Sequence, residues 1–213
     1  TQPVDNNGTD LPAVVQELCP DLNIIFSTNK LSNQHLNYLY NIADVTINLA
    51  SNEGFGLGTC ESLMCGTPII VNVTGGMQDQ CGFEYKGKHL DYTDYSWVES
   101  LHDWRKWQDN KDLTHGEWVK PVWPKSRALM GSPPTPYIFD DRCDWVDAAD
   151  SIQHWYDMGK EQRDECGFIG HEWVCGDESM MSARWMCKNF EDHMNTAFDK
   201  WTPRKRYEIY EVK

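Results

Sequence analysis

Two spacings of apolar residues alternate along the first 76 positions of the chain. Segments 9–20 and 32–43 place apolar residues three and four positions apart, which predicts helices with one buried face, capped by Thr9 and Ser32. Short apolar runs at 23–26, 45–49 and 69–72 have the length of buried strands. A third helix is expected to follow the glycine-rich turn 53–58 and to run through Met64. Helix and strand thus recur about every 22 residues, as in βα units of a parallel sheet.

The expected connections place the ligand-binding loops on one edge of the sheet. Because βαβ connections are right-handed, the three strands should lie parallel and end at the same edge, where open α/β sheets bind ligands. The loops 28–31, 51–58 and 74–76 are therefore expected to converge on one crevice. The sequence predicts an α/β fold with helices flanking a parallel sheet.

Beyond Gly76 the chain becomes irregular and rich in Trp and Pro until about position 136. A strand at 137–139 and helices near 144–156, 160–173 and 179–201 are expected to complete the fold. We divide the chain into a partial core at 1–76, an insertion at 77–136, and a last strand with C-terminal helices of the same domain at 137–213. Some of the ten tryptophans could stack on sugars, but Trp145, Trp155, Trp173 and Trp185 fall at helical positions suited to packing.

Charge and composition narrow the choice of partners. The formal net charge of -14 repels phosphate backbones, so nucleic acid is not an expected partner. The sequence holds neither an apolar run of membrane-spanning length nor a secretory leader, so we expect a soluble, cytoplasmic protein without a transmembrane segment. Its eight cysteines are dispersed and form no C-x-x-C, which favours reduced thiols.

Two glutamates flank the glycine-rich turn, with seven residues between Glu53 and Glu61. Glycines let the backbone approach a ligand closely, and the N–H groups that open the next helix favour an anion such as a diphosphate. Glu61 falls in the first turns of that helix, where a carboxylate can accept two vicinal ribose hydroxyls, whereas Glu53 precedes the turn. Turns of this kind also occur without ligands, so these residues alone leave the function open.

The order of residues from 38 to 76 resembles the donor-binding domain of a large family of retaining glycosyltransferases that includes sucrose synthases, mannosyltransferases and trehalose synthases. The family pattern runs Tyr, Ala-Asp, an apolar strand, Ser, Glu-Gly-Phe-Gly, a second Glu, Cys-Gly-Thr-Pro, another apolar strand and Gly-Gly. The matching positions are Tyr40, Ala43, Asp44, Ser51, Glu53, Gly54, Phe55, Gly56, Glu61, Cys65, Gly66, Thr67, Pro68, Gly75 and Gly76. The resemblance implies a Rossmann-like domain, the C-terminal half of a GT-B fold.

The resemblance also implies a role for each matching site residue. Glu61 would hold the ribose of the nucleotide, and Glu53 would contact hydroxyls of the donor sugar as the catalytic carboxylate. The other implied donor-binding residues are Gly54, Phe55, Gly56 and Leu57 for the sugar and diphosphate, Thr74 and Gly75 for the phosphates, and Asn29, Lys30 and Leu31 for the base.

A reaction scheme follows from the same resemblance. The sugar would leave a nucleotide-diphosphate donor with retention of configuration, by a front-face substitution in which Glu53 positions the sugar and stabilises charge. No cofactor or metal is expected, because the sequence contains neither D-x-D nor H-E-x-x-H. The expected partners are the nucleotide-sugar donor, an unknown glycan or small-molecule acceptor, and an upstream N-terminal Rossmann-like domain.

Two departures from the family pattern limit the resemblance. The Arg and Lys that bind the diphosphate, and the domain that binds the acceptor, would lie upstream of Thr1, so the isolated chain is expected to be inactive. Segment 77–117 is also longer than the usual connection. Two alternatives therefore stay open: a non-catalytic nucleotide-sugar-binding or interaction module, and a GT-B-fold sugar-nucleotide epimerase.

Overall fold

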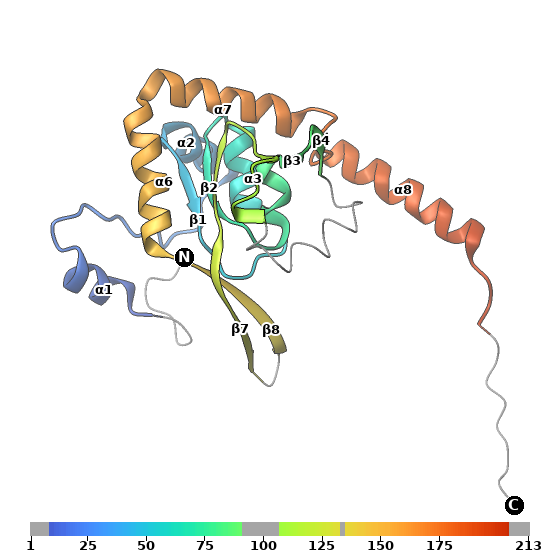
Figure 1. The fold of residues 1–213 in the computed structure, drawn as a ribbon, viewed down its shortest axis with the longest axis horizontal. Helices are drawn as coiled ribbons and strands as arrows, with labels where there is room; N and C mark the ends of the chain where they lie inside the picture. The colour runs from blue at the N-terminus through green and yellow to red at the C-terminus, as the bar shows by residue number, and fades with distance from the viewer. Residues whose placement is uncertain (1–8, 91–106, 133–134, 205–213) are drawn as a thin grey trace, which may run out of the picture. The chain divides into compact units, whose positions relative to one another are not determined.

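The computed structural model describes residues 9–90, 107–132 and 135–204. Its contacts divide the chain into two units, 1–39 and 40–213. Figure 1 gives the labels of the helices and strands.

The first unit contains helix α1 (Leu11–Leu18) and the start of α2 (Asn33–Ile42). Ser32 caps α2 as predicted, since its hydroxyl accepts a hydrogen bond from the His35 amide at 3.3 Å. The predicted cap of α1 is wrong by one residue, because the carboxylate of Asp10, and not Thr9, accepts the bond from the Ala13 amide.

The predicted strand at 23–26 is wrong, because this segment has no regular secondary structure. Ile24 and Ile25 are both exposed. A short apolar run forms a strand only if a neighbouring strand supplies hydrogen bonds, and periodicity gives no information on that neighbour.

The second unit is built on a parallel sheet in the order β1, β2, β6. Its strands are β1 (Thr46–Asn48), β2 (Ile69–Asn72) and β6 (Val119–Val122). The first two lie inside or match the predicted runs at 45–49 and 69–72. The predicted α/β fold, a parallel sheet flanked by helices, is confirmed.

Strand β6 lies within residues 77–136, which we predicted to be an irregular insertion. Pro121 pairs with Val71 in the register of this strand, although proline cannot donate to a ladder. The amides of Ile69 and Val73 donate to the carbonyls of Trp118 and Val122, so every second residue of β6 bonds to β2. Pro121 lies between those positions and turns its missing N–H away from β2, which is compatible with an outer strand.

The two faces of β2 pack on different helices. Its alternating residues Ile69 and Val71 join the larger buried cluster, together with Leu63 of helix α3 (Leu57–Met64). Ile70, on the other face, packs with Trp155 of helix α6 (Trp145–Met158). Helices therefore cover both faces of the sheet, as Figure 1 shows.

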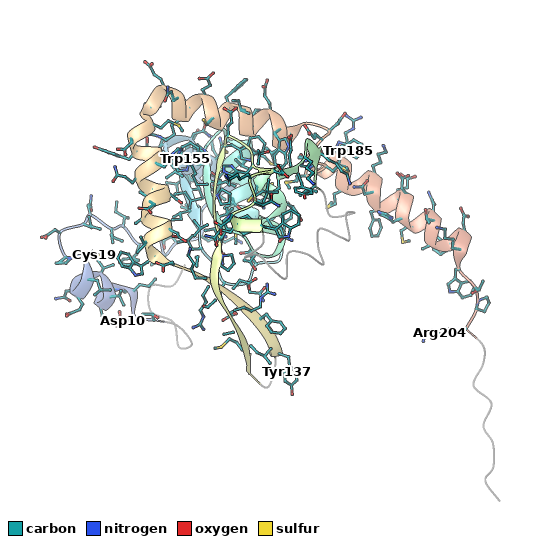
Figure 2. The ribbon with its side chains drawn as sticks, in the orientation of Figure 1. Asp10, Cys19, Tyr137, Trp155, Trp185 and Arg204 are labelled. Atoms are coloured by element: carbon teal, nitrogen blue, oxygen red, sulfur yellow. The ribbon has the colours of Figure 1, made fainter. Side chains whose placement is uncertain are left out.

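Two further sheets are formed by residues that lie between β2 and α6 along the chain. A small antiparallel sheet joins β3 (Glu84–Tyr85) to β4 (Lys88–His89) and β5 (Leu113–Thr114), after two short 3-10 helices, η1 (Gly75–Met77) and η2 (Asp79–Cys81). A long antiparallel hairpin pairs β7 (Pro124–Ser132) with β8 (Thr135–Cys143). The predicted strand at 137–139 is the middle of β8, and Tyr137 lies far along the hairpin in Figure 2.

The predicted C-terminal helices are confirmed as α6, α7 (Lys160–Cys175) and α8 (Ala183–Lys200). Trp155 is buried as expected and is labelled in Figure 2, but Trp145, at the start of the same helix, is 80% exposed. The packing prediction is therefore wrong for Trp145, whose side chain in the first turn of α6 is exposed. Within the described ranges, no helix has the length and apolar character needed to cross a bilayer.

Candidate functional site

The candidate site lies where strands β1 and β2 end. Both strands are parallel, so the loops that follow them, 49–56 and 73–77, leave the sheet at the same edge. These are two of the three loops predicted to converge. The third, with Asn29, Lys30 and Leu31, belongs to the first unit, and its role in binding a base stays a prediction.

The two loops contact each other through backbone atoms. The Gly76 amide donates a hydrogen bond to the Gly54 carbonyl at 3.1 Å. A Cβ atom on Gly75 would lie 1.8 Å from the Glu53 carbonyl oxygen, and one on Gly76 would lie 2.6 Å from the Gly54 oxygen. Contact this close is possible only without side chains at 75 and 76, which gives the Gly-Gly pair a physical reason.

Helix α3 begins inside this site with no side chain capping it. Its N-cap is Gly56, in the left-handed region at φ 84°, where glycine is favoured. The first amide to bond within the helix is that of Cys60, which donates to the Gly56 carbonyl, so the amides of Leu57 and Gly58 precede the helical ladder. Such a terminus attracts an anion.

Glu61 lies one turn into α3, as predicted, and is held by Tyr40. The phenol of Tyr40 donates to Glu61 Oε2 at 3.1 Å. Burial, together with this bond to a carboxylate, raises the pKa of Tyr40 to about 12. Tyr40 therefore stays protonated at neutral pH and fixes one oxygen of the carboxylate, an arrangement suited to accepting hydroxyl groups at the other.

Glu53 and Thr74 occupy the two loops in different ways. Glu53 is half-buried, and its Oε1 lies 3.2 Å from the amide of Gly54. Thr74 is buried, and its hydroxyl donates to Asp141 of β8 at 2.9 Å. The Thr74 amide donates to the Asn72 carbonyl at 2.8 Å, so both its hydroxyl and its backbone N–H have partners, and its role toward phosphate stays a prediction.

A buried glutamine that no sequence pattern pointed to, Gln80, holds the turn at 53–58 through hydrogen bonds to its carbonyl groups. Gln80 Nε2 donates to the carbonyls of Phe55 at 2.6 Å and Gly56 at 3.0 Å. The indole of Trp118 donates in turn to the Gln80 carbonyl at 3.0 Å. No local pattern predicts these bonds, since they join residues 24 to 38 positions apart. They hold the turn with Phe55 exposed and Gly56 buried.

The thiols near the site are poor nucleophiles. Burial, with a smaller contribution from Glu61, raises the pKa of Cys60 to about 11 and also raises that of Cys65. Among the residues that the structure describes, no group of three or more His, Cys, Asp or Glu side chains could hold a metal ion. The described part of the site presents backbone amides and the carboxylates of Glu53 and Glu61.

Comparison with known proteins agrees with this site. Residues 15–109 match the sequence model of the family described as glycosyl transferases group 1, a segment that includes both glutamates and the Gly-Gly pair. The chain is also 32% identical over 74 residues to the D-inositol 3-phosphate glycosyltransferase of Mycobacteroides abscessus. That match covers 33% of this chain and 17% of the relative. Both similarities support glycosyl transfer in general.

Proposed function

We propose that this chain is the nucleotide-sugar-binding half of a retaining glycosyltransferase of the GT-B architecture. The observation that carries the proposal is the contact of the two loops, in which Gly75 and Gly76 pack on Glu53 and Gly54 beside the uncapped start of α3. Backbone amides and two carboxylates thus lie at the carboxyl edge of the parallel sheet, the edge at which open α/β sheets generally bind ligands.

The donor would be divided among three parts of this site. The diphosphate would bind the amides at the start of α3, where the helix dipole favours negative charge. The ribose would bond to Glu61, whose carboxylate Tyr40 orients. The sugar would lie at the Glu53 side of the turn, where that carboxylate can stabilise positive charge at the anomeric carbon as the diphosphate leaves.

The proposed reaction needs a second domain for the acceptor and no cofactor or metal ion. The acceptor-binding half would be an upstream Rossmann-like domain, which would also bring basic groups to the diphosphate. All eight cysteines are free thiols, which fits a reducing compartment, and the cytoplasm is the proposed location.

Calorimetric titration of the chain with UDP, GDP and ADP tests the donor site. We expect one of them to bind with a Kd on the order of 1 mM, about −4.1 kcal/mol, because the upstream basic groups are missing. Glu61→Gln should weaken this binding, whereas Glu172→Gln, at an exposed position of α7, should leave it unchanged. Adding a chelator should change nothing. Absence of heat with all three nucleotides would refute the proposed site, and binding that disappears with the chelator would refute metal independence.

A further inference from the structure

The hairpin β7–β8 begins two residues after β6, next to the candidate site. Its register pairs Arg127 with Asp141, near the end of the hairpin that joins the rest of the unit. The amide of Asp141 donates to the Ser51 carbonyl at 2.8 Å, and Asn52 Nδ2 contacts the Phe139 carbonyl at 3.4 Å. Strand β8 therefore lies along the loop that follows β1.

Asp141 connects this loop with the loop that follows β2. Its carboxylate accepts the Thr74 hydroxyl at Oδ2, and its backbone carbonyl accepts a bond from Asn72 Nδ2 at 2.7 Å. The same side-chain nitrogen of Asn72 also donates to the Ala50 carbonyl at 2.9 Å. One residue of the hairpin thus contacts both of the loops that build the candidate site.

The carboxylate of Asp141 is buried, with 7% of its side chain exposed, and Arg127 compensates its charge. Arg127 Nε lies 2.5 Å from Oδ1 and Nη2 lies 2.8 Å from Oδ2, so the pair is bidentate. The guanidinium also lies over the ring of Phe139, with 5.7 Å from its central carbon to the ring centroid. A buried charge paired in this way has a strongly preferred position, because displacement would leave it without hydrogen bonds in a medium of low dielectric constant.

We infer that Asp141, held by Arg127, is a positioning residue for the Thr74–Gly76 loop and that it keeps this loop against the turn at 53–56 in the geometry that binds the nucleotide. Thr74 immediately precedes the pair of glycines that contact Glu53 and Gly54. Release of its hydroxyl from Asp141 would let the loop rise from the turn and weaken the hydrogen bond from the Gly76 amide to Gly54. The ordering of the loop is a property of the chain itself, whereas its value for a ligand rests on the proposed function.

The chain offers a matched pair of substitutions that removes one charge at adjacent positions. Asp141→Asn removes the charge that faces Thr74. Asp140→Asn removes a charge from the other face of β8, where Asp140 contacts Arg142 at 3.7 Å. Amide hydrogen exchange of Gly76 in the free chain and titration with UDP, GDP and ADP are measured for both variants and the unaltered chain.

We expect Asp141→Asn to accelerate exchange of the Gly76 amide by about tenfold or more, since its bond would open more often. Nucleotide affinity should fall at least roughly threefold, while Asp140→Asn changes both quantities by less than about twofold. Equal exchange of Gly76 in the two Asn variants would overturn the inference, as would faster exchange with unaltered affinity. If Asp141→Asn does not fold, Thr74→Val must show the same acceleration, and normal exchange in that variant overturns the inference. If the unaltered chain binds no nucleotide, the proposed function fails, and the exchange comparison still decides whether Asp141 orders the loop.

Discussion

The close approach of the two loops predicts that a single methyl group at Gly75 disrupts the candidate site. The Cβ atom of alanine would lie 1.8 Å from the Glu53 carbonyl oxygen, whereas real Cβ contacts essentially never fall below 3.0 Å. The loop would have to retreat by about 1.2 Å, the difference between these two distances, which would break the bond between Gly76 and Gly54.

Two energetic terms add up in Gly75→Ala. The backbone at this position has φ +52°, where a side chain costs about 1–2 kcal/mol. The loss of one backbone hydrogen bond costs about 1 kcal/mol net. We expect the free energy of unfolding to fall by about 2–3 kcal/mol, the sum of the two terms, and nucleotide affinity to fall by about tenfold or more because the loop no longer lies on the turn.

Two control variants separate these terms. Gly87→Ala introduces a methyl at φ +75° with no atom within 4 Å, so it should lose about 1–2 kcal/mol of stability and no affinity. Gly54→Ala, in the turn itself, also meets nothing within 4 Å, and it should change stability by less than about 0.5 kcal/mol. Urea unfolding and nucleotide titration of the three variants give both quantities. If Gly75→Ala binds nucleotide as well as Gly87→Ala does, the two loops do not need to touch and the assignment of the site is wrong.

Three further predictions concern the carboxylates, a thiol and the core. In the complete enzyme, Glu61→Gln should raise the donor KM, because the ribose contacts are made both before and during the reaction. Glu53→Gln should lower kcat by about tenfold, equal to about 1.4 kcal/mol. Steady-state kinetics and a melting curve for each variant test this, and a Glu53→Gln variant that melts earlier yet turns over normally would contradict it. Iodoacetamide at pH 8 should modify Cys60 much more slowly than the exposed thiols of α7 and α8. With a pKa of about 11, about one Cys60 thiol in a thousand is ionised at that pH. The rate of Cys60 modification, followed by mass spectrometry, should therefore increase about tenfold per pH unit. Chemical unfolding should show a loss of about 3–5 kcal/mol for Trp155→Ala and less than about 0.5 kcal/mol for Trp145→Ala, and equal losses would contradict the burial of the former.

The sequence predicted the elements whose signal is local. Strand β2, the turn at 53–58 and helix α3 follow from a short apolar run, from glycines and from a stop at Gly66 to Pro68, and each of these signals lies in or next to the element that it defines. Strand β6 was missed because Pro121 argues against a strand unless the strand is known to be at an edge. The segment 23–26 was predicted wrongly because an apolar run does not identify its partner.

The candidate site shows the same division between local and distant information. The turn, Glu61 and the glycine pair could be found from their order along the chain. Gln80 and Asp141 could not, because each acts on the loops through bonds to residues more than 20 positions away. The roles of Glu53 and Thr74 remain predictions, and the structure shows only which groups these two residues contact.

The proline in β6 gives the parallel sheet two unlike borders. At the outer side of β6, Pro121 has no N–H to offer, so a strand arriving there would find its ladder interrupted at the middle of the segment. At the outer side of β1, the N–H of Ile47 points away from β2, whereas the Thr46 amide donates to the Pro68 carbonyl, and no described residue continues the sheet there. An additional strand, from another part of a longer polypeptide or from a second molecule during aggregation, should therefore pair with β1. Pairing with the outer side of β6 is disfavoured by Pro121.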